Sequence, residues 1–98
     1  MYAKLHVEGT QSVLAACDRE LLGKTLEQEK ISFTVYESFY GGKIVGKKEL
    51  LELLDDNENI NLVGKKCVGL ALEKGLIKES SIIRIKGIPH AQIFKISL

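Results

Sequence analysis

Strict alternation of polar and apolar residues marks the beginning of the chain. Over residues 2–8, YAKLHVE, the odd positions are apolar and the even positions are polar. That period of two predicts a half-buried strand with Ala3, Leu5 and Val7 on its buried face. A turn follows at residues 9–11, GTQ, and the apolar run SVLAAC predicts a second strand over residues 12–17. We therefore expect a β-hairpin at the N-terminus.

The next part of the chain predicts a short helix and a third strand. The segment DRELLG, residues 18–23, suits one helical turn, with Asp18 as its N-cap and Gly23 as its end. Alternation returns in ISFTVYE, residues 31–37, and favours a strand. The glycine-rich segment SFYGGKIVG, residues 38–46, is typical of a loop.

Two amphipathic segments predict the main helices. KKELLELLDD, residues 47–56, has one apolar stripe. That stripe consists of Leu50, Leu51, Leu53 and Leu54. LVGKKCVGLALEK, residues 62–74, predicts a second helix with Asn61 as its N-cap and Gly75 as its C-cap.

The C-terminal part of the chain returns to a strand pattern. SIIRIKG, residues 81–87, and AQIFKISL, residues 91–98, predict two paired strands. The heptapeptide GIPHAQI, residues 87–93, contains the turn between them. Gly87 allows a sharp exit from the first strand and Pro89 fixes its own φ angle, so we expect a rigid connection there.

The order of these elements predicts an α+β fold. Strands gather at both ends of the chain and helices lie between them, which favours a mixed or antiparallel sheet with the two main helices packed on one face. No linker or low-complexity segment divides the chain. We therefore expect residues 1–98 to form a single domain.

Composition excludes several classes of protein. The 98 residues are 45% apolar and 28% charged, with a net charge of +1, so no global field attracts nucleic acid or membrane. The N-terminus lacks the basic and apolar blocks of a signal peptide, and we expect a soluble cytoplasmic protein. Cys17 and Cys67 stand in apolar contexts and are expected to be buried, reduced thiols. With His6 and His90 they show no close ligand spacing, so we expect no metal and no cofactor.

A short internal repeat places lysines at both helix starts. IVGKKELLELL at residues 44–54 resembles LVGKKCVGLAL at residues 62–72. Lys47 and Lys48, like Lys65 and Lys66, follow a glycine at a place where the helix dipole already carries positive charge. Such a start suits a phosphate group. A solvated charged helix end explains the same residues without a ligand.

Two further segments have both a functional and a structural interpretation. Phe39 to Lys43, FYGGK, offers rings for base stacking, glycines for close approach and a lysine for phosphate, but a double glycine also makes an ordinary tight turn. His90 and Gln92 share one strand face and could present hydrogen-bonding groups to a ligand, or they could belong to a plain hairpin. No nucleophile motif or phosphate-binding nucleotide loop is present, and we assign no catalytic residue.

Four motifs together resemble one known family. CDRELLGK, FYGG, NLVG and PHAQ occur in this order at Cys17 to Lys24, Phe39 to Gly42, Asn61 to Gly64, and Pro89 to Gln92. The set is similar to the archaeal domain of unknown function 424 family, catalogued as predicted RNA-binding proteins. The resemblance spans the chain and implies an archaeal, cytoplasmic α+β protein linked to RNA and translation. It implies no catalytic residue.

Three functional hypotheses follow. The first is a non-enzymatic RNA-binding accessory factor that binds tRNA or rRNA and works with a translation factor. Its contacts would be Phe39, Tyr40, Gly41, Gly42, Lys43, Lys47, Lys48, Asn61, Gly64, Lys65, Lys66, His90 and Gln92, joined in one positive surface. The second is a small enzyme or ligand-binding protein whose cleft is formed by FYGG, NLVG and PHAQ, with His90 inside it. The third is a protein-interaction module that pairs through an exposed strand edge.

Overall fold

Eight strands and three α-helices make up the part of the chain that the structure describes, residues 1–96 of a computed structural model. The strands are β1 (Tyr2–Glu8), β2 (Gln11–Cys17), β3 (Thr25–Gln28), β4 (Ile31–Thr34), β5 (Lys43–Ile44), β6 (Asn59–Val63), β7 (Ile83–Ile85) and β8 (Ile88–Phe94). The α-helices are α1 (Glu37–Tyr40), α2 (Lys47–Asp56) and α3 (Lys65–Glu73), and short 3-10 helices lie at η1 (Arg19–Leu21) and η2 (Glu79–Ser81).

The strands form a six-stranded mixed sheet and a separate two-stranded ribbon. The order in the large sheet is β5-β1-β2-β6-β8-β7. Only β2 and β6, at its centre, run parallel, and every other pair is antiparallel. A parallel pair needs a crossover connection, and here the chain between β2 and β6 provides the ribbon, α1, β5 and α2. The predicted α+β single domain with a mixed sheet is confirmed.

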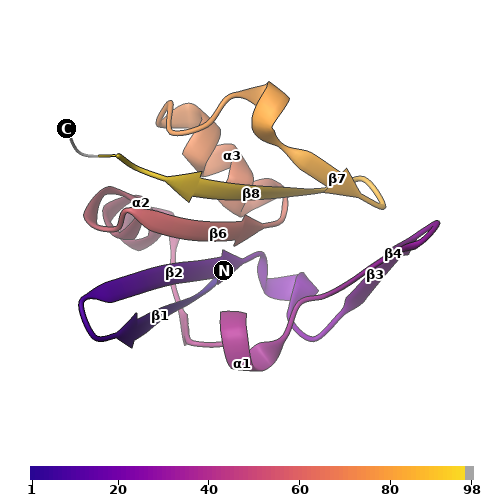
Figure 1. The fold of residues 1–98 in the computed structure, drawn as a ribbon, viewed down its shortest axis with the longest axis horizontal. Helices are drawn as coiled ribbons and strands as arrows, with labels where there is room; N and C mark the ends of the chain where they lie inside the picture. The colour runs from indigo at the N-terminus through magenta and orange to yellow at the C-terminus, as the bar shows by residue number, and fades with distance from the viewer. Residues whose placement is uncertain (97–98) are drawn as a thin grey trace.

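The main helices α2 and α3 both pack on one face of this sheet, as the sequence predicts (Figure 1). Leu50 and Leu54 of α2 are fully buried, and Val68 of α3 is 1% exposed. They meet alternate residues of the central strands, among them Leu14 and Leu62. Leu residues three and four positions apart lie on one side of a helix, which explains why the stripe of α2 faces the sheet.

A second, smaller core lies on the opposite face. It joins sheet residues such as Ala15 and Val63 to Val35 and Tyr40, which come from the segment between β2 and α2. The β3–β4 ribbon extends beyond this core as an arm at one end of the fold (Figure 1). We call the face of the sheet opposite α2 and α3 the open face.

One prediction failed at the centre of the sheet. Residues 59–63 form the strand β6, whereas the sequence predicts a connection and the beginning of a helix there. Asn61 therefore lies inside a strand, and α3 begins after Gly64. NINLV is buried on both faces near its end, so it lacks the clear alternation of a half-buried strand. The short strands β3 and β5 were also not predicted.

Two predictions about the hairpins, one on burial in β1 and one on the position of the C-terminal turn, are wrong in part. Ala3 is buried, but Leu5 and Val7 are 49% and 66% exposed, because the two helices cover only the part of β1 near Ala3. The C-terminal turn is Lys86–Gly87, both with φ in the left-handed region, so Pro89 lies within β8 and not in the connection. The part of the predicted last strand at residues 97–98 lies outside the described residues.

Several local predictions are confirmed. β1 and β2 form the expected hairpin, and α2 has the predicted bounds. Gly75 follows the end of α3 with a φ of 73°. Cys17 and Cys67 are free thiols with no exposed surface. Among residues 1–96, no helix combines the length and the apolar character that a membrane crossing requires.

Candidate functional site

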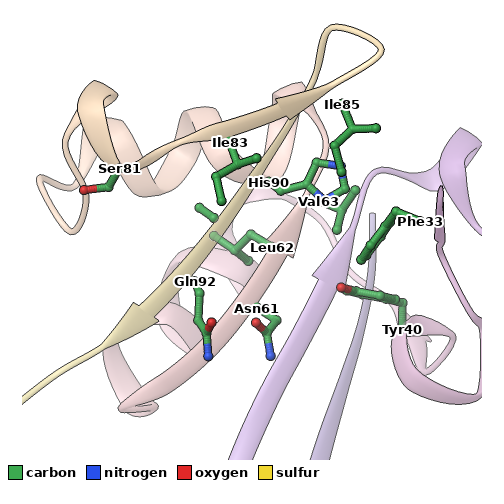
Figure 2. Close-up of a pocket in the computed structure, with 11 residues that line it drawn as sticks. Phe33, Tyr40, Asn61, Leu62, Val63, Ser81, Ile83, Ile85, His90 and Gln92 are labelled. Carbon is green, nitrogen blue, oxygen red and sulfur yellow. The ribbon is translucent and has the colours of Figure 1, made fainter. Parts of the chain in front are cut away.

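The register of the sheet brings two carboxamides together. Asn61 of β6 and Gln92 of β8 are directly opposite one another, and both side chains point to the open face. Their neighbours Leu62 and Ala91 point to the helices, as the alternation of a strand requires. Figure 2 shows the two carboxamides side by side at one end of a cleft. NLVG and PHAQ, far apart in sequence, thus meet at adjacent strands.

The cleft that contains these groups has a volume of about 310 Å³. Its lining residues are Phe33, Tyr40, Asn61, Leu62, Val63, Ser81, Ile83, Ile85, His90, Ala91 and Gln92. They come from β4, α1, β6, the end of η2, β7 and β8. FYGG contributes Tyr40, while NLVG and PHAQ contribute neighbouring residues that include Asn61, His90 and Gln92, so the three segments meet at this cleft. We call this site the carboxamide cleft.

Aromatic side chains form one side of the carboxamide cleft. Tyr40 is 6% exposed, and its hydroxyl is directed toward the space between the strands and Phe33 (Figure 2). Burial, with a smaller effect of nearby Cys17, raises the pKa of Tyr40 to about 12, so the hydroxyl keeps its proton and can donate it in a hydrogen bond. Tyr40, Phe33 and Asn61 also line an adjoining hollow of about 400 Å³.

The helix that carries Tyr40 is held by stacked rings. Phe39 stacks on His6 with ring centroids 4.7 Å apart, and its ring meets Tyr40 edge-on at 4.9 Å. His6 Nε2 lies 2.7 Å from the Phe39 carbonyl oxygen, and the Lys4 ammonium donates to the Ser38 carbonyl at 2.9 Å. A helix this short has little stability of its own. These contacts with β1 therefore position α1 and its tyrosine.

His90 lies at the buried end of the cleft. The Phe33 ring packs edge-on against its imidazole with centroids 4.5 Å apart. His90 Nε2 is buried and has no hydrogen-bond partner among the described residues. Burial lowers the pKa of His90, which favours a neutral imidazole. The ring is therefore an uncharged part of the wall.

The carboxamide cleft is electrostatically neutral. None of the lining residues that the structure describes is an Asp, Glu, Lys or Arg. The polar groups are the Tyr40 hydroxyl, the two carboxamides, Ser81 and His90, surrounded by aliphatic and aromatic side chains. Such a site suits an uncharged planar ligand that donates and accepts hydrogen bonds. It offers no cation for a phosphate.

The glycines of FYGG have a structural explanation. A Cβ atom on Gly42 would lie 2.1 Å from the Ala3 carbonyl oxygen, and one on Gly41 would lie 2.6 Å from the Glu37 carbonyl oxygen. Both positions need glycine because backbone packs against backbone there. Lys43 forms an ion pair with Glu49. Of the FYGGK segment, the two aromatic residues are thus the ones that reach the open face.

The predicted lysines lie on the other side of the sheet, with the helices. Lys47, Lys65 and Lys66 line a hollow of about 280 Å³ together with Met1 and Glu73. The Lys47 ammonium is 4.0 Å from the Glu73 carboxylate, and Lys48 is exposed outside this hollow. We call the site the lysine hollow. The structure therefore divides the predicted contact residues between two sites and does not join them in one positive surface.

The beginning of α3 is occupied by an acid of the chain itself. Asp18 is 2% exposed. The sequence predicts that it caps η1, but its side chain makes no capping hydrogen bond there. Its carboxylate accepts hydrogen bonds from the backbone N–H groups of Lys66 and Cys67, each at 2.9 Å. Gly64 lies against it, because a Cβ there would come 2.3 Å from Asp18 Cγ. These amides are therefore not free for a phosphate.

Four contributors to the cleft were missed at the level of sequence: Phe33, Ser81, Ile83 and Ile85. Phe33 was assigned to an ordinary strand, yet it closes the cleft over His90. Ile83 and Ile85 of the edge strand β7 line the opposite wall. The alternation of IRI on a short edge strand signals a face with two isoleucines, but only the register of β7 against β8 shows which face that is.

A known family matches most of the chain. Residues 5–96 match the family described as a protein of unknown function, DUF424. The chain belongs to that family. All four motifs used in the sequence analysis lie within the matched residues.

A solved structure shows the same fold. It is described as the crystal structure of an uncharacterized conserved protein from Methanopyrus kandleri. It is 29% identical to this DUF424 chain, with a TM-score of 0.77 over 95% of this chain and 89% of the other. Curated proteins give no match.

Proposed function

We propose that this DUF424 protein is a binding protein whose carboxamide cleft holds a planar, uncharged nucleobase, free as a nucleoside or exposed in single-stranded RNA. The observation that carries the proposal is the pairing of Asn61 with Gln92 on adjacent strands beside Tyr40. Each carboxamide has a carbonyl oxygen that accepts and an NH₂ group that donates hydrogen bonds. The edges of nucleobases carry the same two kinds of group.

The aromatic wall supports the same ligand class. Phe33 and Tyr40 border the cleft, and the adjoining hollow adds Phe39. Proteins that recognise unpaired bases place such rings against the base face and polar groups against its edge. Unlike a phosphate, a base needs no cation, which fits the neutral lining.

We propose that the cleft binds its ligand and does not catalyse a reaction. Acid–base catalysis needs a group whose proton can reach the ligand. His90 Nε2 is buried and without a partner, and no carboxylate is among the described lining residues to orient the imidazole. A role for His90 in the shape of the cleft is therefore the simpler assignment.

Titration of the ¹⁵N-labelled protein with the four nucleosides and with short single-stranded oligoribonucleotides tests the proposal. We expect resonances of Asn61, Gln92 and Tyr40 to shift, and the variants Asn61→Ala and Gln92→Ala to bind more weakly. Gln11→Ala is the matched control, because this exposed carboxamide lies outside the cleft. If neither nucleosides nor oligoribonucleotides perturb these residues, the proposal is wrong.

A second candidate function rests on the lysine hollow. Lys47, Lys65 and Lys66 come together from two helices in a hollow that Met1 and Glu73 also line. The cluster supports contact with the sugar-phosphate backbone of tRNA or rRNA, as an accessory factor of cytoplasmic translation would make. Such binding weakens with salt as counterions are released.

A filter-binding assay with tRNA and rRNA at several salt concentrations tests this second function. The triple variant with Gln at positions 47, 65 and 66 should bind more weakly and with a smaller salt slope. A triple variant with Gln in place of Lys30, Lys78 and Lys86, exposed lysines outside the hollow, is the matched control. Equal loss in both variants would show a nonspecific charge effect and dismiss the site.

A further inference from the structure

Another hollow, of about 500 Å³, lies between the β1–β2 hairpin and the end of α2. Its lining residues are Thr10, Gln11, Ser12, Val13, Asp56, Asn57, Glu58, Asn59 and Phe94. They come from the β1–β2 hairpin, the last residue of α2 and the segment after it, and the ends of β6 and β8. The carboxamide cleft shares none of these residues. We call this site the Phe94 pocket.

The Phe94 pocket carries negative charge. Asp56 and Glu58 line it, and neither forms an ion pair among the described residues. Asp56 is the last residue of α2 and Glu58 lies two residues beyond it, next to the helix C-terminus, where backbone carbonyls carry partial negative charge.

Lys74 and Lys95, the cations at the C-terminus of α2, already have partners. Lys95 directs its ammonium to the carbonyls of Leu54 and Asp55, and Lys74 pairs with the Asp55 carboxylate at 2.8 Å. These contacts offset the negative charge of Asp55 and the partial negative charge of the carbonyls in the last turn of α2. The carboxylates of Asp56 and Glu58 remain exposed and without a cationic partner in residues 1–96.

An exposed aromatic ring lies beside these acids. Phe94 is 70% exposed, and it is opposite Asn59 in the register of β8 and β6. A large apolar side chain in water gains from being covered. A ring next to carboxylates is a favourable surface for a cation, because the ring face attracts positive charge and the acids compensate it.

We propose that the Phe94 pocket binds an arginine side chain of a partner protein. The guanidinium group stacks on the Phe94 ring and pairs with Asp56 or Glu58, while its remaining N–H groups donate to the side-chain oxygens of the hairpin, such as that of Ser12. Arginine fits better than lysine because its planar group stacks on a ring and donates in several directions at once. Negative charge at the same place excludes the phosphates of RNA.

A peptide titration followed by NMR tests this assignment. The probe is an acetylated, amidated Gly-Arg-Gly tripeptide, and the same peptide with citrulline, which is uncharged, is the matched probe. We expect the arginine peptide to shift the Phe94 ring protons and the amides of Glu58 and Asn59. The citrulline peptide should bind at least about threefold more weakly, because it lacks the charge that the ring and acids attract.

Two variants and one control complete the test. Phe94→Leu, and the double variant Asp56→Asn with Glu58→Gln, should each lower the affinity about threefold or more. Glu52→Gln, an exposed acid of α2 outside the pocket, should leave it unchanged. Equal binding of both peptides, or equal loss in the Glu52 variant, would overturn the proposal. Shifts that grow with protein concentration alone would assign the pocket to a second copy of the chain instead.

Discussion

The carboxylate of Asp18 accepts a hydrogen bond from the backbone N–H of Cys67 at 2.9 Å, although 49 positions separate the two residues. Asp18 directly follows β2, and Cys67 lies in the first turn of α3, after β6. The contact therefore ties the two parallel strands at the centre of the sheet to the helix that covers them. It is a buried N-cap from a distant part of the chain.

Loss of this cap should destabilise the protein. Asp18→Ala leaves the N–H groups of Lys66 and Cys67 without their acceptor, and we expect the free energy of unfolding to fall by about 2 kcal/mol. Asp18→Asn keeps one acceptor oxygen and should cost less. Urea unfolding followed by circular dichroism measures both. Equal stability of wild type and Asp18→Ala would refute the role of the cap.

Two glycines at the same helix should respond in opposite directions. Gly64→Ala puts a Cβ 2.3 Å from Asp18 Cγ at a φ of 115°, and should cost about 3 kcal/mol. Gly69→Ala meets no atom within 4 Å inside α3 and should stabilise the protein by about 0.5 kcal/mol or more. Thermal unfolding of the two variants checks the pair. A stable Gly64→Ala protein would show that the close approach to Asp18 is not required.

The partly buried imidazole of His90 should make stability depend on pH. Burial lowers the pKa of His90 in the folded state, while the unfolded chain keeps the ordinary value near 6.5. The unfolded state then binds more protons, so stability should fall as the pH decreases below about 6.5, until the folded-state pKa is reached. His90→Gln removes the contribution of His90 to the pH dependence of stability. The difference between the pH profiles of wild type and His90→Gln measures this contribution. Parallel profiles over this range would argue against a neutral, buried His90.

The two thiols should be inert while the protein is folded. Burial is the main reason that the pKa of Cys17 rises to about 11, and burial together with nearby Asp18 raises the pKa of Cys67 as well. Thiols react as thiolates, so few reactive groups exist at neutral pH. A thiol reagent followed by absorbance should react with both cysteines only after urea is added. Rapid reaction in the native state would show that one of the two cores opens.

Local patterns in the sequence were sufficient for the elements with one buried face. The leucine spacing of residues 47–56 reports directly which side of α2 is covered, and the alternation of residues 2–8 identifies β1 and the face on which Ala3 is buried, although Leu5 and Val7 on that face are exposed. The same reasoning fails for β6, because Leu62 packs under the helices and Val63 under Tyr40, so both faces are apolar. An apolar segment of this kind resembles the start of a helix.

The site was harder to derive than the fold. Asn61, His90 and Gln92 were selected from motifs, and their meeting depends on the register of β6 against β8, which no local pattern encodes. Asp18 was recognised as a cap but assigned to the adjacent helix, since the distant helix becomes a neighbour only after folding. Of the four lysines at the two helix starts, Lys47, Lys65 and Lys66 line one hollow and Lys48 lies outside it, and their side of the sheet depends on the crossover between β2 and β6.

The side-chain NH₂ resonances of Asn61 and Gln92 provide the most direct test of the carboxamide cleft. They are observed in ¹⁵N spectra and assigned by comparison with the Asn61→Ala and Gln92→Ala variants. When a nucleoside is added, we predict that both NH₂ groups shift together with the same saturation curve, while the NH₂ group of Gln11 stays unchanged. Saturating shifts elsewhere on the protein, with Asn61 and Gln92 unaffected, would contradict the assignment of the cleft as the base-binding site.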